Sequence, residues 1–407
     1  MMNTVESTTA GFVSERLHGV TDALQRYVDE GKIAGAVTLI ARRNQIAYFE
    51  CAGMMDIGAH QAMQRNTIFR IASMTKPITA TALMMLFEEG LFQLDDPIAD
   101  FIPAFDDAAV FVEESETGYE TAKAQRPITI RDLFTHTSGI GLGAGDGSPI
   151  EALYTRCVDE LKQRGVTLQQ AVEELAELPL AHQPGSAWTY GLSYEVLACL
   201  VEILSGNWFD VFLRERLYEP LGMTDTSYLV APGSEDRLAT LYQPTAHGNL
   251  DVVETSKNSP HVWPPGFTYE SGTGWTSGSG MLVSTAMDYA RFAMMLLNGG
   301  KLEGIRLLSP ETVQMMIFNH LPAGMVPFPH VGYGYGLGVR VLMNVAQSGV
   351  LGSPGTFAGD GGHGTFFWAD PQEELVGLCM IQLDHSPYPL FQQLQTLAYQ
   401  ALIDMSR

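Results

Sequence analysis

The sequence predicts an α/β (α+β) protein in which one antiparallel sheet, built from segments near both termini, is flanked by helices and carries an inserted, mostly helical domain. Two observations predict this architecture. Strand-like segments cluster at the two ends of the 407-residue chain, and helical patterns fill its middle. We therefore expect an α/β domain over residues 1–78 and 270–407, a helical domain over residues 79–269, and a functional site in the cleft between them.

The first strand-like segments follow a predicted helix over residues 13–30. Residues 36–41 and 46–52 are rich in the residue types that favour strands, and the polar Arg42-Arg43-Asn44-Gln45 lies between them. Two such runs joined by a short polar turn indicate a β-hairpin.

The remaining elements follow in chain order. Helical patterns occupy residues 77–89, 131–135, 168–178, 194–204 and 286–297. Residues 109–127 predict an exposed acidic hairpin, whose charge we interpret as a solvated face rather than a docking site. Near the C-terminus, strand patterns over residues 334–343, 364–370 and 374–382 precede apolar residues at helical spacing over 391–405.

The composition argues against several classes of protein. Asp and Glu number 46 against 23 Lys and Arg, so the net charge is −23 and the surface repels phosphate backbones. Hydrophobic residues at 46% and charged residues at 17% suit a large core. No basic start followed by an apolar run opens the chain, and no segment reaches the ~18 apolar residues of a membrane helix. We expect a cytoplasmic protein with no nucleic-acid or membrane partner, and we leave its oligomeric state open.

The cysteines give no sign of a metal or redox site. Cys51, Cys157, Cys199 and Cys379 lie dozens of residues apart and form no C-x-x-C pair, so we expect buried free thiols. No two histidines have the spacing of metal ligands either.

The first candidate for chemistry is Ser73, followed three residues later by Lys76 at the start of a predicted helix. If Ser73 opens that helix, Lys76 lies one turn further on the same face, where its amine reaches the hydroxyl. A serine hydroxyl needs a neighbouring base to act as a nucleophile, and a neutral Lys76 amine can be that base. The N–H of Ser73 itself can donate to an oxyanion. The alternative is a polar helix start that matches the pattern by coincidence.

Two further segments are candidates. Tyr190 follows the turn residues Pro184-Gly185 and precedes a helix, so its phenol can project into a cleft and relay a proton, although a core tyrosine is the alternative. Residues 359–364 match G-x-G-x-x-G but lead into a strand rather than a helix, which argues against dinucleotide binding. Small residues there let a ligand approach the backbone, so the N–H of His363 is a second candidate oxyanion donor.

These motifs together resemble the serine-reactive penicillin-recognition superfamily of penicillin-binding proteins and β-lactamases. Within it, the sequence is most similar to class C β-lactamase-like carboxylesterases, often called family VIII esterases. The likeness covers most of the chain. It includes the Ser-Met-Thr-Lys segment, the Pro-Gly-x-x-Trp-x-Tyr segment that ends at Tyr190, and residues 94–97, 128–139 and 279–300.

The resemblance implies a role for each of these residues. Ser73 corresponds to the acylated nucleophile, Lys76 to its partner base, Tyr190 to the second base or proton relay, and His363 to the residue whose amide completes the oxyanion hole. It also implies a β-lactamase/DD-peptidase-like fold with the site in the cleft between two domains, and neither a metal nor an organic cofactor.

Two departures from the β-lactamase pattern bear on the substrate. β-Lactamases of this type carry Tyr-x-Asn, whereas here Tyr190 is followed by Gly191, Leu192 and Ser193, so the amide that holds an acylamino group is missing. They also place Lys before Thr-Gly in a late strand, whereas this chain has Asp360-Gly361-Gly362, and a carboxylate there repels an anionic substrate. The sequence therefore predicts a serine carboxylesterase acting on small neutral esters. A β-lactamase, an acyltransferase and a non-catalytic binding module stay open as alternatives.

A few other residues are relevant to the same predicted site. His136 is interpreted as a loop residue tied into local hydrogen bonds rather than a general base. The approach to a G-x-S-x-G nucleophile motif at residues 191–195 ends in Glu195 instead of glycine, which argues against a conventional Ser-His-Asp hydrolase. Tyr154, Trp263 and Phe357 are candidate pocket aromatics.

Overall fold

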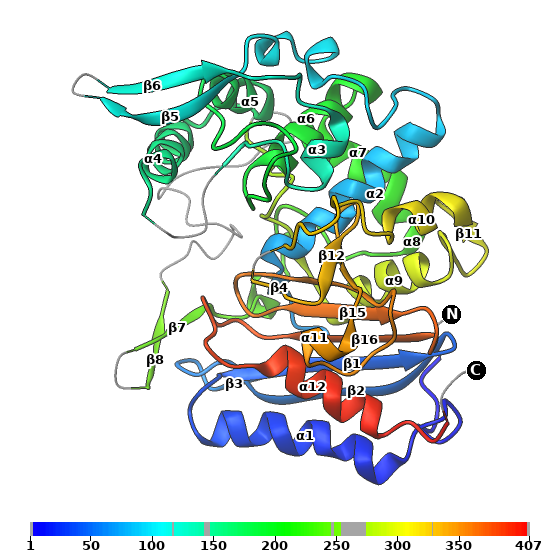
Figure 1. Ribbon diagram of the computed structural model, residues 1–407. Helices are drawn as coiled ribbons and strands as arrows, with labels where there is room; N and C mark the ends of the chain where they lie inside the picture. Colours follow the sequence, from blue (N-terminus) through cyan, green and yellow to red (C-terminus); the bar gives the residue numbers. More distant parts are fainter. Residues whose placement is uncertain are drawn as a thin grey trace.

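One eight-stranded antiparallel sheet forms the centre of the fold (Figure 1). The computed structural model describes residues 3–115, 118–141, 147–245, 248–253, 274–327 and 329–404. The strand order is β12-β13-β14-β15-β16-β1-β2-β3, and β1 pairs with β16, so segments from the two ends of the chain meet inside the sheet. The predicted antiparallel sheet from both termini is therefore confirmed. Its strands are β1 (Gly35–Arg42), β2 (Gln45–Asp56), β3 (Gln61–Ala62), β12 (Tyr333–Tyr335), β13 (Arg340–Leu342), β14 (Phe357–Asp360), β15 (Phe366–Asp370) and β16 (Leu375–Met380).

Helices cover both faces of this sheet (Figure 1). α1 (Ser14–Asp29) and α12 (Leu390–Gln400) lie together on one face, and α9 (Ala286–Leu297) lies on the other. Along β1, Val37 and Leu39 face the apolar cluster that includes α9, whereas Ala36 and Ile40 face the cluster that includes α1 and α12. Because side chains alternate between two covered faces, every residue of β1 is buried.

The other helices lie beside the sheet, and α6 (Ser193–Ser205) is central among them. It packs against α2 (Thr75–Glu88), α3 (Ile130–Phe134), α5 (Leu168–Ala176) and α7 (Phe209–Leu213). The structure also describes α4 (Pro149–Arg164) and several short helices and turns: α8 (Glu219–Leu221), α10 (Pro310–Met316), α11 (Val345–Ser348), the 3-10 turns Ala72–Met74, Ile98–Asp100, Pro103–Phe105 and Glu235–Arg237, and the π turn Arg214–Tyr218.

Among the described residues, four two-stranded ladders lie outside the main sheet. The hairpin predicted over residues 109–127 is one of them, and all residues of its second strand are exposed. The ladders are β4 (Phe69–Arg70) with β9 (Val283–Ser284), β5 (Ala109–Ser115) with β6 (Gly118–Lys123), β7 (Tyr242–Pro244) with β8 (Leu250–Val252), and β10 (Lys301–Leu302) with β11 (Ile305–Arg306).

Most predicted elements are present, and some differ in extent. The helices predicted between residues 13 and 297 begin and end within two residues of the expected positions. The predicted strand over 334–343 is instead two strands, because the chain turns at Gly338, whose φ of +96° suits glycine. The last helix ends at Gln400 rather than 405. α4 was not predicted, although Ser148 and Pro149 form a recognisable helix start and Ser148 caps it.

The structure also bears on cysteines and membrane spans. All four cysteines are free, but Cys51 and Cys157 are only half-buried, so the expectation of burial holds for Cys199 and Cys379 alone. Within the described ranges no single helix is long and apolar enough to cross a membrane, although α6 and the bent segment 209–221 pass that test together by length and composition. The domain boundaries at residues 78 and 270 stay predictions.

A buried ion pair ties the first hairpin to the end of the sheet. Arg42 Nη2 lies 2.8 Å from Glu373 Oε2, and both side chains are at most 2% exposed. Arg42 also donates to the carbonyl oxygens of Glu373, Gly11 and Asp404. The pair therefore fixes both termini against the sheet.

Glu373→Ala is expected to lower the free energy of unfolding by about 3–5 kcal/mol, because it leaves the Arg42 charge buried without its carboxylate. Chemical denaturation measures the change. The neighbouring Glu374 is a matched control, because it pairs with Arg43 at 3.5 Å while its side chain is 59% exposed. Glu374→Ala should change stability by less than about 0.5 kcal/mol. Equal effects of the two substitutions would contradict the assigned role of the buried pair.

Candidate active site

Ser73 lies in a sharp turn between a short strand and a helix. β4 ends at Arg70, the 3-10 turn Ala72–Met74 follows, and α2 begins at Thr75. Ala72 adopts a φ of +44°, which is unusual for a residue with a side chain and occurs often at functional turns. Thr75 Oγ1 donates to the Ala72 carbonyl at 2.7 Å and holds the turn in place. The predicted helix start is therefore one turn of 3-10 helix followed by α2.

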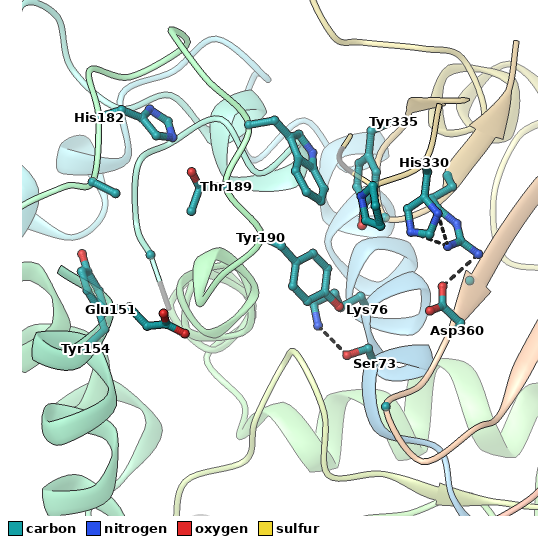
Figure 2. Close-up of a pocket in the computed structure, with 18 of the residues that line it drawn as sticks. Ser73, Lys76, Glu151, Tyr154, His182, Thr189, Tyr190, His330, Tyr335 and Asp360 are labelled. Atoms are coloured by element: carbon teal, nitrogen blue, oxygen red, sulfur yellow. Dashed lines mark hydrogen bonds and ion pairs between the residues drawn. The ribbon is translucent and has the colours of Figure 1, made fainter. Parts of the chain in front are cut away.

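Lys76 is the closest basic group to this serine. Its Nζ donates to Ser73 Oγ at 3.1 Å and to the Ser279 carbonyl at 2.8 Å, and the residue is only 4% exposed (Figure 2). A neutral amine can donate to the carbonyl and still offer its lone pair to the serine proton. The predicted nucleophile and its predicted base therefore lie at hydrogen-bond distance.

Tyr190 completes the group. Lys76 Nζ lies 4.5 Å from the centre of the Tyr190 ring, and Figure 2 shows the two side chains together beside Ser73. Tyr190 is 37% exposed, although it lies among buried aromatic side chains. The three side chains that the sequence singles out therefore lie together, and their chemical roles stay predictions.

The turn after α3 packs against Tyr190 through the ring of His136. His136 has a φ of +58°, and its ring centre lies 4.6 Å from that of Tyr190 and 5.1 Å from that of Tyr194. Its backbone carbonyl accepts from the N–H of Thr189 at 2.9 Å, but neither ring nitrogen has a hydrogen-bond partner among the described residues. The expected local hydrogen bonds of His136 are therefore made by its backbone and not by its ring. Burial, with the Lys76 charge, lowers the pKa of His136 well below its usual value. The imidazole is a neutral packing group.

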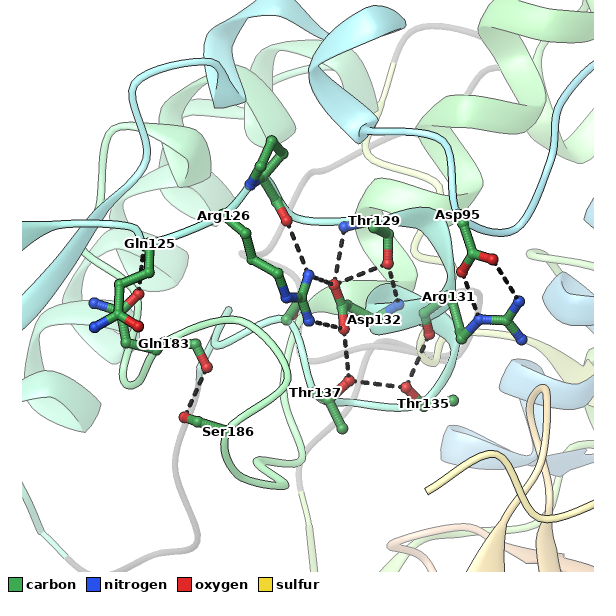
Figure 3. A network of polar contacts seen from close by, with 12 residues as sticks. Asp95, Gln125, Arg126, Thr129, Arg131, Asp132, Thr135, Thr137, Gln183 and Ser186 are labelled. Carbon is green, nitrogen blue, oxygen red and sulfur yellow. Dashed lines mark hydrogen bonds and ion pairs between the residues drawn. The ribbon is translucent and has the colours of Figure 1, made fainter. Parts of the chain in front are cut away.

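A polar network fixes this turn (Figure 3). Asp132 accepts from both Nη atoms of Arg126, at 2.6 and 2.9 Å, and from Thr137 Oγ1 at 3.0 Å. Thr129 caps α3 reciprocally with Asp132. The hydrogen bond and charge of Asp132 raise the pKa of the Arg126 guanidinium.

The glycine-rich turn after β14 lies against the chain that leads to Ser73. A Cβ added at Gly361 would lie 2.3 Å from the Ile71 carbonyl oxygen, so only glycine fits there. The side chain of His363 pairs through Nδ1 with Asp384 Oδ1 at 3.0 Å. Burial lowers the pKa of His363 below its usual value, and the Asp384 charge opposes this shift.

Two cavities meet at the three predicted residues, since Ser73, Lys76 and Tyr190 line both. The larger cavity has a volume of 740 Å³ (Figure 2). Of the predicted cleft residues, Asp360 and Gly362 line the larger cavity, and Leu192 and His363 line the smaller one of 460 Å³. Gly361 lines neither, because it is packed against the Ile71 carbonyl.

The remaining predictions for the cleft have mixed outcomes. Tyr154 lines the larger cavity, whereas Phe357 does not, because it is fully buried within the sheet core. Trp263 lies outside the described residues. Ser193 is buried and its hydroxyl bonds to Ser138 Oγ at 2.9 Å, so the residue that faces the smaller cavity is Leu192.

Sequence reasoning missed the partner of Asp360. Arg340 Nη2 lies 2.9 Å from Asp360 Oδ1, and Arg340 also donates to the ring of His330. Burial, and then the Arg340 charge, lower the pKa of His330 to about 4, so the imidazole is neutral and accepts. Arg340 therefore offsets the charge of Asp360 at the edge of the larger cavity, and the effect of Asp360 on substrate charge stays a prediction. An arginine within an apolar strand pattern is the signal that could have found this pair.

These features define a site of serine, lysine and tyrosine side chains in a protein whose main sheet is built from both termini. Within the parts of the chain that the structure describes, no group of three His, Cys, Asp or Glu side chains could hold a metal ion. A family model described as Beta-lactamase matches residues 20–399. The chain therefore belongs to the beta-lactamase family of serine hydrolases, and its fold is the β-lactamase/DD-peptidase fold.

Individual proteins and solved structures are also similar to this chain. Protein Rv1367c of Mycobacterium tuberculosis is 37% identical over 383 residues, which are 91% of this chain and 90% of that protein. Esterase EstB of Burkholderia gladioli is 29% identical over 395 residues, covering 95% and 93% of the two chains. Among solved structures, EstCE1, described as a hydrolase with promiscuous acyltransferase activity, aligns with a TM-score of 0.75 at 26% identity, covering 96% of this chain and 98% of that one.

Proposed function

We propose that the protein is a serine carboxylesterase of the family VIII type, which hydrolyses small neutral, short-chain carboxylic esters through an acyl-enzyme on Ser73. The observation that carries this proposal is the 3.1 Å contact between Lys76 Nζ and Ser73 Oγ, beside Tyr190 at the junction of two cavities. The name of esterase EstB supports the choice of ester substrates.

In the proposed mechanism, Ser73 Oγ attacks the ester carbonyl while the Lys76/Tyr190 pair takes its proton. The N–H groups of Ser73 and of the 361–364 turn, with His363 as the predicted position, hold the oxyanion. The ester C–O bond then breaks, and the relay returns the proton to the departing alcohol. Water attacks the acyl-enzyme with the same relay, which restores Ser73 and releases the carboxylic acid.

The preference for neutral esters rests on the lining of the site. Leu192 presents an apolar side chain where β-lactamases of this type hold an amide, and Asp360 and Arg340 balance each other's charge. Because Arg340 is already paired with Asp360, it is not an unpaired cation that could bind a substrate carboxylate. Sustained turnover of a chromogenic cephalosporin at rates that match ester turnover would overturn this preference.

Asp360→Asn is expected to raise the activity toward anionic esters relative to neutral ones, because the substitution leaves the Arg340 charge without its carboxylate. The kcat/KM for a p-nitrophenyl ester whose acyl chain ends in a carboxylate should rise about tenfold relative to that for p-nitrophenyl butyrate. The neutral butyrate is the internal control and should change less than about threefold. An unchanged ratio in the folded variant would show that the pair does not select substrate charge.

The direct test of the proposal combines a serine probe with an ester panel. Fluorophosphonate treatment of the intact protein, followed by peptide mass spectrometry, should place one stoichiometric adduct on Ser73. Short p-nitrophenyl esters should be turned over, and the probe should abolish that turnover. A protein with no adduct and no turnover would instead be the non-catalytic binding module.

Acyl transfer is a second candidate. Two cavities meet at Ser73, so one can hold the acyl group while the other admits an alcohol, and EstCE1 is described as a hydrolase with promiscuous acyltransferase activity. Product analysis with excess alcohol distinguishes the two: a new ester as the main product supports transfer, and free acid supports hydrolysis.

A further inference from the structure

Glu195 is a buried carboxylate that sequence reasoning noted only because it breaks a motif. It lies in the first turn of α6, five residues after Tyr190, and is 1% exposed. Its two oxygens accept four hydrogen bonds, all from one short segment. The donors are Trp275 Nε1 at 2.7 Å, Ser277 Oγ at 2.6 Å, the Gly278 N–H at 3.1 Å and Ser279 Oγ.

Among the residues that the structure describes, no Lys, Arg or His side chain lies within ion-pair distance of Glu195. A buried charge is costly unless hydrogen bonds replace its hydration. The segment 275–279, which supplies all four donors, is therefore held in a defined shape around Glu195.

The same segment contacts the nucleophile helix from its other side. The Ser279 carbonyl accepts from Lys76 Nζ at 2.8 Å, and the Gly278 carbonyl accepts from Thr79 Oγ1 at 2.7 Å. A Cβ added at Gly278 would lie 2.1 Å from the Tyr194 carbonyl oxygen, so the segment is pressed against α6. It joins α6, which begins just after Tyr190, to α2, which carries Lys76.

We propose that Glu195 is a positioning residue for Lys76, acting through the segment 275–279. It lines neither cavity, so it touches no substrate. Its carboxylate fixes Ser279, the Ser279 carbonyl orients the Lys76 amine, and that amine lies at hydrogen-bond distance from Ser73 Oγ. This inference rests on the proposed roles of Ser73 and Lys76.

Glu195→Ala is the first test. It should lower kcat for a p-nitrophenyl ester about 100-fold, because a small displacement of a catalytic group is enough for such a loss, while KM changes less than about threefold. The rate at which a fluorophosphonate labels Ser73 should fall by the same factor. This second readout does not depend on which ester the enzyme prefers.

Glu195→Gln should largely restore both rates, to within about fivefold of the parent. The glutamine carbonyl can accept from Trp275 and Gly278, whose N–H groups only donate. The Ser277 and Ser279 hydroxyls can rotate to accept from its amide. The matched control is Glu202→Gln on the same helix, because Glu202 accepts from the Phe209 N–H at 2.9 Å and makes no contact with the segment. It should leave both rates unchanged within about twofold.

If Glu195→Ala does not fold, Ser277→Ala combined with Ser279→Ala decides the question, because it removes both donors to Oε1 and keeps the Ser279 carbonyl. That variant should lose about tenfold in kcat and in labelling rate. Parental rates in a folded Glu195→Ala or in this double variant would overturn the positioning role while leaving the proposed function intact. A parent protein whose Ser73 is never labelled would overturn the proposed function itself.

Discussion

Ser73→Ala is expected to abolish turnover of short p-nitrophenyl esters, with kcat falling about 10⁴-fold or more. Without the hydroxyl no acyl-enzyme can form, and the oxyanion donors and the binding cavities alone give only a small residual rate. The measurement is release of p-nitrophenol by purified variant whose thermal unfolding matches that of the parent protein.

Ser193→Ala is the matched control, because Ser193 belongs to the only approach to a G-x-S-x-G motif that was considered for the nucleophile. Its hydroxyl bonds to Ser138 and is buried, so activity should persist within about threefold. Retained turnover in Ser73→Ala, or its loss in a folded Ser193→Ala, would refute the assignment of the nucleophile.

Lys76→Met and Tyr190→Phe are each expected to lower kcat about 10³-fold, and the double variant should lose little more than either single variant. The reason is that both side chains serve one proton, which moves from Ser73 to the leaving group. Lys76 Nζ contacts both Ser73 Oγ and the Tyr190 ring face, so removing either partner disables the same relay. Steady-state kinetics of the three variants form a double-mutant cycle.

Tyr154→Phe controls for loss of a cavity phenol. Tyr154 lines the larger cavity, and its hydroxyl donates to the Pro179 carbonyl at 3.1 Å, away from Ser73. Its loss should change kcat less than about fivefold. Independent losses that multiply to about 10⁶-fold in the Lys76 and Tyr190 double variant would contradict a shared proton.

Much of the fold follows from local patterns. The apolar runs of β1, β15 and β16 are recognisable because every residue of these strands is buried in a sheet with both faces covered. α9 begins and ends at the predicted residues, since Thr285 caps its start and glycines follow its end. α4 was missed because only three of its sixteen residues are buried, which leaves a weak apolar stripe.

The part of the site whose geometry is local could likewise be predicted from the sequence. Ser73 and Lys76 are three residues apart, and helical geometry alone brings them together. The resemblance of the motifs added Tyr190 and the glycine-rich turn. Asp360 was noticed, but its partner Arg340 was not, because Arg340 lies 20 residues earlier in the chain, on a neighbouring strand.

The sequence by itself thus determined which elements form and which serine has a lysine one turn away, because both depend on the spacing of near neighbours in the chain. Only the tertiary structure decided that Lys76 donates to a carbonyl 203 residues away, that Glu195 holds the segment carrying that carbonyl, and that Asp360 has a cation beside it. Contacts of this kind depend on how the sheet and helices pack. The periodicity of a sequence pattern does not indicate which distant side chains that packing brings together.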